Sequence, residues 1–304
     1  MKRLPVWLML MGTAIIWGRP VDAEQAIQAV GIENEYADVI AQIGGKYVQV
    51  TAIESDPNVD PHSFEVSPKI AAELAGAQLI VENGLGYDSW ADKMIAASRN
   101  SNRRIINVQH LLRLADSTPN PHLWYDPKDM PVVAQAIADD LAARRPAEAG
   151  YFHSNLRAFD ASLRPWLQAL AAFKAAHPHT PVAVTEPVAD YMVQAAGSYI
   201  LTPFSLETAT MNGHDPSPQD VAKQQDLLSS HKVKAFLYNR QVTDSLTQSF
   251  LELAKKAGVP VVAVYETMPT PGFTYQSWML AETQALGKAV ADGQSTASLG
   301  GASP

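Results

Sequence analysis

Residues 147–176, AEAGYFHSNLRAFDASLRPWLQALAAFKAA, decide the architecture of this chain. From Tyr151 to Phe173 the large apolar side chains recur mostly at steps of three or four residues, which is the helical period. Only Pro165 interrupts the pattern, and we expect a kink there because proline lacks the amide hydrogen that a helix interior needs. A long helix in this position predicts a stiff spine between two lobes, with little room for wide hinge closure.

Strand-like apolar runs alternate with helical patterns on both sides of this spine. The expected strands are residues 26–32, 47–53, 78–81, 104–108, 182–185, 199–202, 233–238 and 261–265. The expected helices between them are residues 33–43, 68–75, 89–97, 188–196, 219–230, 244–257 and 275–290, with Pro68, Pro187 and Pro218 in first turns. Such alternation predicts mostly parallel sheets with helical crossovers. We therefore predict an α/β fold with an N-terminal lobe (24–146), a linking helix (147–176) and a C-terminal lobe (177–292).

The two ends of the chain have a different composition. Lys2 and Arg3 precede the apolar residues 4–17, and small residues before position 24 predict signal-peptide cleavage after Ala23. The apolar stretch is shorter than the roughly 20 residues that a membrane span needs. Residues 293–304 are small and polar, and we expect them to be disordered.

The amino-acid composition indicates in which compartment the protein is found and which classes of partner it can bind. The chain has no cysteine, so we expect no disulfide, no lipid on the mature N-terminus and no thiolate metal ligand. An exported, unlipidated chain is predicted to be soluble in a Gram-negative periplasm. The formal charge is −8, and it becomes −10 without residues 1–23, which argues against nucleic-acid binding.

Four side chains are candidate metal ligands. His62 follows Asp60-Pro61, and His122 follows Asn120-Pro121, in each case downstream of an expected strand. Glu186 and Glu266 directly follow expected strands of the second half. Ligands of open α/β sheets bind outside the carboxyl ends of the strands, so these residues predict one metal site in a cleft between the lobes.

Each candidate also has an ordinary interpretation. His62 and His122 could be surface histidines, Glu186 could favour a helix N-terminus by its charge, and Glu266 could be an ordinary loop acid. The joint placement of all four favours the metal site. Two imidazoles and two carboxylates suit Zn²⁺ or Mn²⁺, and Fe²⁺ also fits, and two carboxylates neutralise one dication.

Other residues could support this site. We expect Asp60, Asp126 or a carbonyl to accept a hydrogen bond from an imidazole, which would set its tautomer. Four aromatic residues could wall the cleft from water: Trp124, Tyr125, Tyr191 and Tyr265. His214 lies in a turn-rich loop and is a weaker candidate ligand or part of a lid.

At these residues the chain resembles the zinc- and manganese-binding solute-binding proteins of bacterial ABC importers, the ZnuA-like family. The similarity rests on Asp60-Pro61-His62, Asn120-Pro121-His122-Leu123-Trp124, residues 82–87 and Glu266-Thr267-Met268-Pro269, and it covers nearly all of the mature chain. It implies two α/β lobes joined by a long helix, with the ligands at His62, His122, Glu186 and Glu266. The family's fourth ligand is commonly aspartate, so Glu266 is a departure. The His-rich loop of many zinc-binding members is absent, because residues 63–121 contain only His110.

The leading hypothesis is therefore a non-enzymatic periplasmic receptor, expected to be a monomer, that captures one divalent transition metal ion and delivers it to an ABC permease. Two alternatives remain open. One is a metal-stabilised, adhesin-like binding protein on the same fold. The other is a metal-dependent hydrolase, which would need an open coordination position and a general base, for which only Asp60 or Glu65 could be named.

Overall fold

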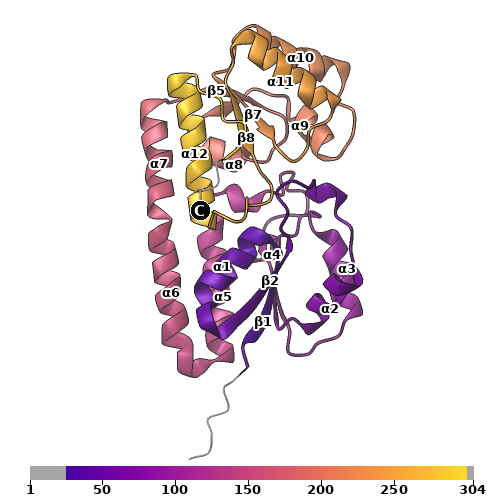
Figure 1. Cartoon of the computed structure of the whole chain (residues 1–304), viewed down its shortest axis with the longest axis vertical. Helices are drawn as coiled ribbons and strands as arrows, with labels where there is room; N and C mark the ends of the chain where they lie inside the picture. Colours follow the sequence, from indigo (N-terminus) through magenta and orange to yellow (C-terminus); the bar gives the residue numbers. More distant parts are fainter. Residues whose placement is uncertain (1–24, 300–304) are drawn as a thin grey trace, which may run out of the picture.

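The computed structural model describes residues 25–299, so the expected signal peptide lies outside the described residues. Two α/β lobes are stacked along the long axis, and a column of helices runs beside both of them (Figure 1). Among the described residues, no helix has the length and apolar character that a membrane crossing requires.

The N-terminal lobe contains a four-stranded parallel sheet in the order β2-β1-β3-β4. Its strands are β1 (Ile27–Glu33), β2 (Val48–Glu54), β3 (Leu79–Glu82) and β4 (Arg104–Asn107). Its helices are α1 (Asn34–Gly44), α2 (Pro68–Gly76), α3 (Ser89–Ala97), α4 (Val108–Leu111) and α5 (Asp129–Arg144), with short 3₁₀ turns at Gly45–Tyr47, Pro61–Ser63, Leu123–Tyr125 and Pro146–Glu148. The Ser67 hydroxyl accepts from Ile70 N and Pro68 occupies the first turn of α2, as the sequence predicts.

The C-terminal lobe repeats the arrangement with a parallel sheet in the order β6-β5-β7-β8. Its strands are β5 (Pro181–Val184), β6 (Tyr199–Ile200), β7 (Ala235–Asn239) and β8 (Val261–Val264). Its helices are α8 (Asp190–Ala195), α9 (Phe204–Met211), α10 (Pro218–Ser229), α11 (Ser245–Ala257) and α12 (Tyr275–Asp292). The predicted α/β class with two parallel sheets is confirmed.

The spine consists of α6 (Ala149–Ser162) and α7 (Arg164–Ala176), which continue one another along the side of both lobes (Figure 1). The interruption falls at Leu163 rather than at Pro165. Proline is tolerated in the first turn of a helix, and Pro165 takes that place in α7.

Helix α12 lies beside α7 and couples the spine to both lobes (Figure 1). Trp166 of α7 is fully buried and donates its indole N–H to Thr283 of α12 at 3.0 Å. At the start of α12, the Tyr275 amide donates to Asp38 of α1 at 2.8 Å, and its hydroxyl donates to the Trp124 carbonyl at 2.7 Å. One continuous apolar core therefore runs from the first sheet through the spine to the second.

Several local expectations differ from the structure. Helices α4, α5 and α9 were not expected, and in α5 the apolar residues are mixed with alanines and charges rather than set in a clean stripe. Pro187 is not in a first turn, since α8 begins only at Asp190. The tail expected to be disordered runs along β8 as far as it is described: Thr296 exchanges backbone hydrogen bonds with Val261 and Ala263 at 2.8 Å. Residues 300–304 lie outside the described residues.

Candidate metal centre

The four predicted ligands come from loops at the carboxyl ends of the strands. His62 sits in the 3₁₀ turn after β2, and His122 directly precedes the turn at Leu123–Tyr125. Glu186 and Glu266 follow β5 and β8 by two residues. Both sheets thus direct their strand ends at the same space between the lobes, where α/β sheets commonly bind ligands.

Glu266 lies at the centre of the cluster and is buried. Its Oε2 atom is 3.3 Å from His62 Nε2 and 3.3 Å from His122 Nε2, and it accepts from the Tyr87 hydroxyl at 2.9 Å. The two imidazoles come from the N-terminal lobe and the carboxylate from the C-terminal lobe. Both lobes must therefore be in place for the cluster to exist.

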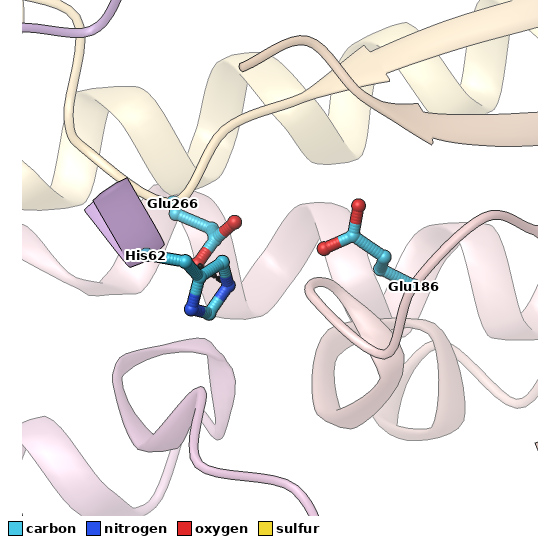
Figure 2. A group of neighbouring side chains, drawn as sticks. All are labelled: His62, Glu186 and Glu266. Carbon is cyan, nitrogen blue, oxygen red and sulfur yellow. Dashed lines mark ion pairs between the residues drawn. The ribbon is translucent and has the colours of Figure 1, made fainter. Parts of the chain in front are cut away.

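Glu186 completes the group from the opposite side, as Figure 2 shows. His62, Glu186 and Glu266 each offer a ligand atom, and these atoms lie within 4.8 Å of one another. Glu186 is buried, and its Oε1 atom has no hydrogen-bond partner. A buried carboxylate oxygen without a partner is costly unless a cation or proton occupies the adjoining space.

The electrostatic environment of the cluster favours the protonated forms of His62 and Glu186, two of the groups that would bind a cation. Burial opposes ionisation of Glu266, but hydrogen bonds from His122 and His62 outweigh it and hold the pKa of this carboxyl well below its usual range. Burial, followed by the charge of Glu266, raises the pKa of Glu186 to about 8. Burial opposes the charge on His62, yet its hydrogen bond and ion pair with Glu266 raise the pKa of His62 to about 9.

Asn120 fixes the orientation of His122. Its side-chain oxygen accepts from His122 N at 3.0 Å and lies 2.8 Å from His122 Nδ1, while its amide nitrogen donates to the Pro187 carbonyl at 2.7 Å. Because that oxygen can only accept, Nδ1 carries a proton and Nε2 is the atom directed at the cluster.

Of the three expected acceptors for an imidazole, a carbonyl oxygen takes this place at His122, namely that of the Asn120 side chain, whereas Asp60 and Asp126 bond to backbone amides instead. The Asp60 carboxylate caps its own turn and accepts from the His62 backbone amide at 2.8 Å. The Asp126 carboxylate accepts from the Lys128 amide at 3.0 Å. Both acids follow the common habit of short polar side chains, which bond to backbone two residues on.

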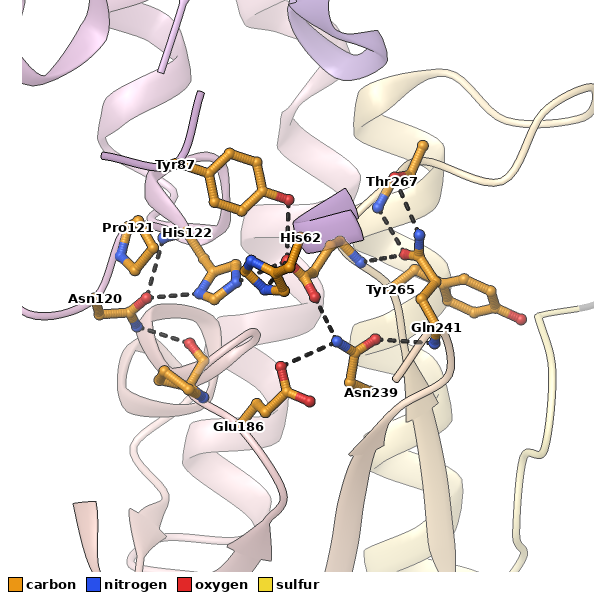
Figure 3. Close-up of polar contacts among 12 residues, drawn as sticks. His62, Tyr87, Asn120, Pro121, His122, Glu186, Asn239, Gln241, Tyr265 and Thr267 are labelled. Atoms are coloured by element: carbon orange, nitrogen blue, oxygen red, sulfur yellow. Dashed lines mark hydrogen bonds and ion pairs between the residues drawn. The ribbon is translucent and has the colours of Figure 1, made fainter. Parts of the chain in front are cut away.

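Two amide side chains that the sequence reasoning missed hold the acids in place (Figure 3). Asn239, at the end of β7, donates to Glu186 Oε2 at 3.2 Å and to Glu266 Oε1. The Gln241 side-chain oxygen accepts from the amides of Glu266 and Thr267 at 2.7 and 2.9 Å. Its amide nitrogen donates to the Val59 carbonyl, in the loop that carries His62, at 2.7 Å. The strand-end rule that selected the ligands would also have selected Asn239.

The proposed aromatic walls have mixed outcomes. Trp124 packs edge-on to His122 with ring centroids 5.4 Å apart, and Tyr191 donates to the Asn120 carbonyl at 2.9 Å. Tyr125 is buried and donates to the Tyr265 carbonyl, whereas the Tyr265 hydroxyl lies 3.4 Å from the Leu299 amide in the tail. Tyr87, which was not selected, lies nearer to the ligands than Tyr265 does.

A cavity of about 400 Å³ lies against His62 and is lined by Asp60, His62, Ser63, Thr210, Met211, Asn212, Gly213 and Val242. His62 is the exposed member of the ligand-forming group, and Glu186 and Glu266 lie deeper. His214 is exposed and does not belong to that group among the described residues. Residues 211–213, at the end of α9 and in the loop that follows it, therefore line this cavity. The neighbouring His214 is not part of the ligand-forming group.

Comparisons with known proteins agree with this architecture. Residues 33–289 match the family model described as the periplasmic component A of the zinc-uptake complex, ZnuA. The manganese-binding lipoprotein MntA of Bacillus subtilis is 22% identical over 249 residues, covering 78% of each chain.

Solved structures share the fold. A crystal structure of ZnuA superposes with a TM-score of 0.71 at 22% identity, over 88% of this chain and 100% of that one. The manganese-bound periplasmic metal-binding protein of Candidatus Liberibacter asiaticus gives a TM-score of 0.71 at 21% identity, with the same coverage. Because the family model matches residues 33–289, which are most of the chain, the chain belongs to the ZnuA family of periplasmic metal-binding components of ABC metal importers.

Proposed function

We propose that this protein captures one divalent transition metal ion through His62, His122, Glu186 and Glu266. The observation that carries the proposal is the convergence of both imidazoles on Glu266 Oε2, with the unpartnered carboxylate of Glu186 opposite. Burying like-charged acids side by side costs stability unless a cation or protons compensate, so the arrangement fits a cation site.

The donor set narrows the cargo to borderline metal ions. Nitrogen from two histidines and oxygen from two carboxylates suit Zn²⁺, Mn²⁺ or Fe²⁺, and with no cysteine the chain has no thiolate to offer a softer ion. The dication and the two carboxylates sum to zero charge. A neutral site can be buried without the penalty of an isolated charge.

We further propose that the loaded receptor delivers the ion to an ABC permease and acts as an unlipidated monomer in the periplasm. Family membership supports the transport role, and the lack of cysteine supports the absence of a lipid anchor. Family membership also supports a binding role rather than hydrolysis. Of the two acids considered as a general base, Asp60 accepts from the His62 amide and Glu65 is exposed at the surface.

Metal analysis of protein purified from periplasm, followed by competition titration, tests the proposal. We expect one equivalent of bound metal, and we expect His62→Ala to weaken binding by at least about a hundredfold. His214→Ala is the matched control, because this histidine lies in the loop after α9 yet is outside the ligand group. Wild-type protein that binds no metal, or equal losses in both variants, would contradict the proposal.

A further inference from the structure

Residues 295–299, here called the tail strap, run along the outer edge of β8, the last strand of its sheet. Thr296 holds the strap with two backbone hydrogen bonds of 2.8 Å, in which its amide donates to the Val261 carbonyl and its carbonyl accepts from the Ala263 amide. The Ser295 hydroxyl accepts from the Val261 amide at 3.1 Å. The backbone groups at the start of β8 are therefore paired on their outer side by the tail strap.

Beyond Thr296, the tail strap reaches the hydroxyl groups of two buried tyrosines. Tyr238 donates to the Ala297 carbonyl at 3.1 Å, and the Leu299 amide lies 3.4 Å from the Tyr265 hydroxyl. The Leu299 side chain also packs against the continuous apolar core. Because Tyr238 belongs to β7 and Tyr265 directly follows β8, the strap is attached to both strands.

Each of these tyrosines directly precedes a residue of the metal cluster. Asn239 follows Tyr238 and donates to Glu186 Oε2 at 3.2 Å and to Glu266 Oε1. Glu266 follows Tyr265, and both imidazoles approach its Oε2 atom. Figure 3 shows the Tyr265 ring turned away from the cluster. Neighbouring residues of an extended chain point to opposite sides, so the same two backbone segments carry strap contacts on one side and cluster contacts on the other.

The tail strap is attached lightly enough to be released. Most of its residues are exposed, and its hydrogen bonds are few. A cavity of about 190 Å³ is lined by Thr296 and Leu299 of the strap and by Gln284 and Lys288 of α12, so packing between the strap and this helix is incomplete. Exposed segments with few packed neighbours open locally at a small cost in free energy. Docked and released forms of the strap are thus both accessible.

We infer that the tail strap positions Asn239 and Glu266 for metal binding, so that docking of the strap and binding of the metal strengthen one another. The inference rests on the proposed function. A docked strap fixes Tyr238 and Tyr265 at their hydroxyl ends and so restricts the backbone directly before both cluster residues. Metal binding restricts the same backbone from the inner side. Two events that order one segment each lower the entropy cost of the other, and the coupling is equal in both directions.

The test removes or breaks the strap and measures Zn²⁺ affinity by chelator competition. A chain that ends at Gln294 lacks the strap but keeps the cap of α12, in which the Gln294 amide donates to the Lys288 carbonyl. A chain that ends at Leu299 is its control, because it keeps the whole strap. Thr296→Pro removes the amide that bonds to β8. Ser298→Pro is the matched control, since the Ser298 amide has no hydrogen-bond partner among residues 25–299.

We expect the chain that ends at Gln294 and the Thr296→Pro variant to bind Zn²⁺ about five- to tenfold more weakly than the wild type, the lower end of coupling between linked sites. Both controls should stay within about twofold of the wild type. In the wild type, Zn²⁺ should slow hydrogen exchange of the Thr296 amide by the same factor, which a strap that serves stability alone would not show.

Unchanged affinity in both test variants, or an equal loss in test variants and controls, would overturn the inference. Unchanged exchange of the Thr296 amide on metal binding would also overturn it, and this measurement on the wild type does not depend on whether the variants fold. Wild-type protein that binds no Zn²⁺ would instead refute the proposed function itself.

Discussion

Metal binding should release about two protons at pH 7 and should therefore strengthen steeply as the pH rises. The pKa of His62 is raised to about 9 and that of Glu186 to about 8, so both carry protons at neutral pH in the metal-free protein. A metal ligand must be deprotonated, and each proton released changes the affinity by a factor of about ten per pH unit well below its pKa.

These pKa values give a sharp expectation. Because both are raised, the protons persist to higher pH, and affinity is lost as pH falls through 9 and 8. Between pH 8 and pH 7 the affinity should drop about fiftyfold. With the ordinary values of 6.5 and 4.5, the same interval would change it by less than about 1.5-fold, and the loss would begin only below pH 7.

Chelator competition at pH 7, 8 and 9 measures the slope, and calorimetry in buffers of different ionisation enthalpy counts the protons. Glu186→Gln is the informative variant: it removes one titrating group, so proton release should fall to about one even though binding is weaker. Equal affinity at pH 7 and pH 8 in the wild type would refute the expectation that His62 and Glu186 are protonated in the metal-free protein.

Three further predictions concern stability and shape. Zinc at 1,000 times its dissociation constant should stabilise the protein by about 4 kcal/mol in denaturant titrations, and no shift of the midpoint would mean no binding to the native state. Trp166→Ala should cost about 3–5 kcal/mol of unfolding free energy, because the indole is fully buried between α7 and α12 and is bonded to Thr283; a loss below about 1 kcal/mol would argue against that packing. Solution scattering should differ little between metal-free and metal-bound protein, since the spine and the Gln241 bridge to Val59 limit lobe rotation, and a large change in radius of gyration would show that the lobes rotate as bodies.

Periodicity predicted the elements whose apolar residues follow one clear repeat. The eight strands and the spine were found in this way, and their ends shift by only a few residues in the structure. Helix α5 was not predicted, because its buried residues include alanines that alternate with charged and polar positions. The pairing of the tail with β8 was not predicted, because small polar residues can still lie along an unpaired strand edge, where backbone groups rather than side chains make the contacts.

The ligand candidates were predictable because histidine and glutamate directly after a strand are chemically conspicuous. Asn120, Asn239 and Gln241 were not selected, since neutral amides carry no charge and occur in many loops. Their importance arises from distances to residues far away in the sequence, such as the bond from Gln241 to Val59. Such pairings depend on how the two lobes are stacked, which no local pattern encodes.

The position of α12 has a consequence for the order in which the chain can fold. Asn34, Asp38 and Gln42, near the start of the described chain, bond to Met268, Tyr275 and Gln276, more than 200 residues later. These side chains of α1 therefore lack their hydrogen-bond partners until the last helix has been synthesised. Contacts of such long sequence separation slow folding, because the closure entropy is lost before the contact forms. We expect a chain that ends before residue 275 to stay incompletely folded, so a nascent chain would complete its first lobe only after the C-terminal helix has been made.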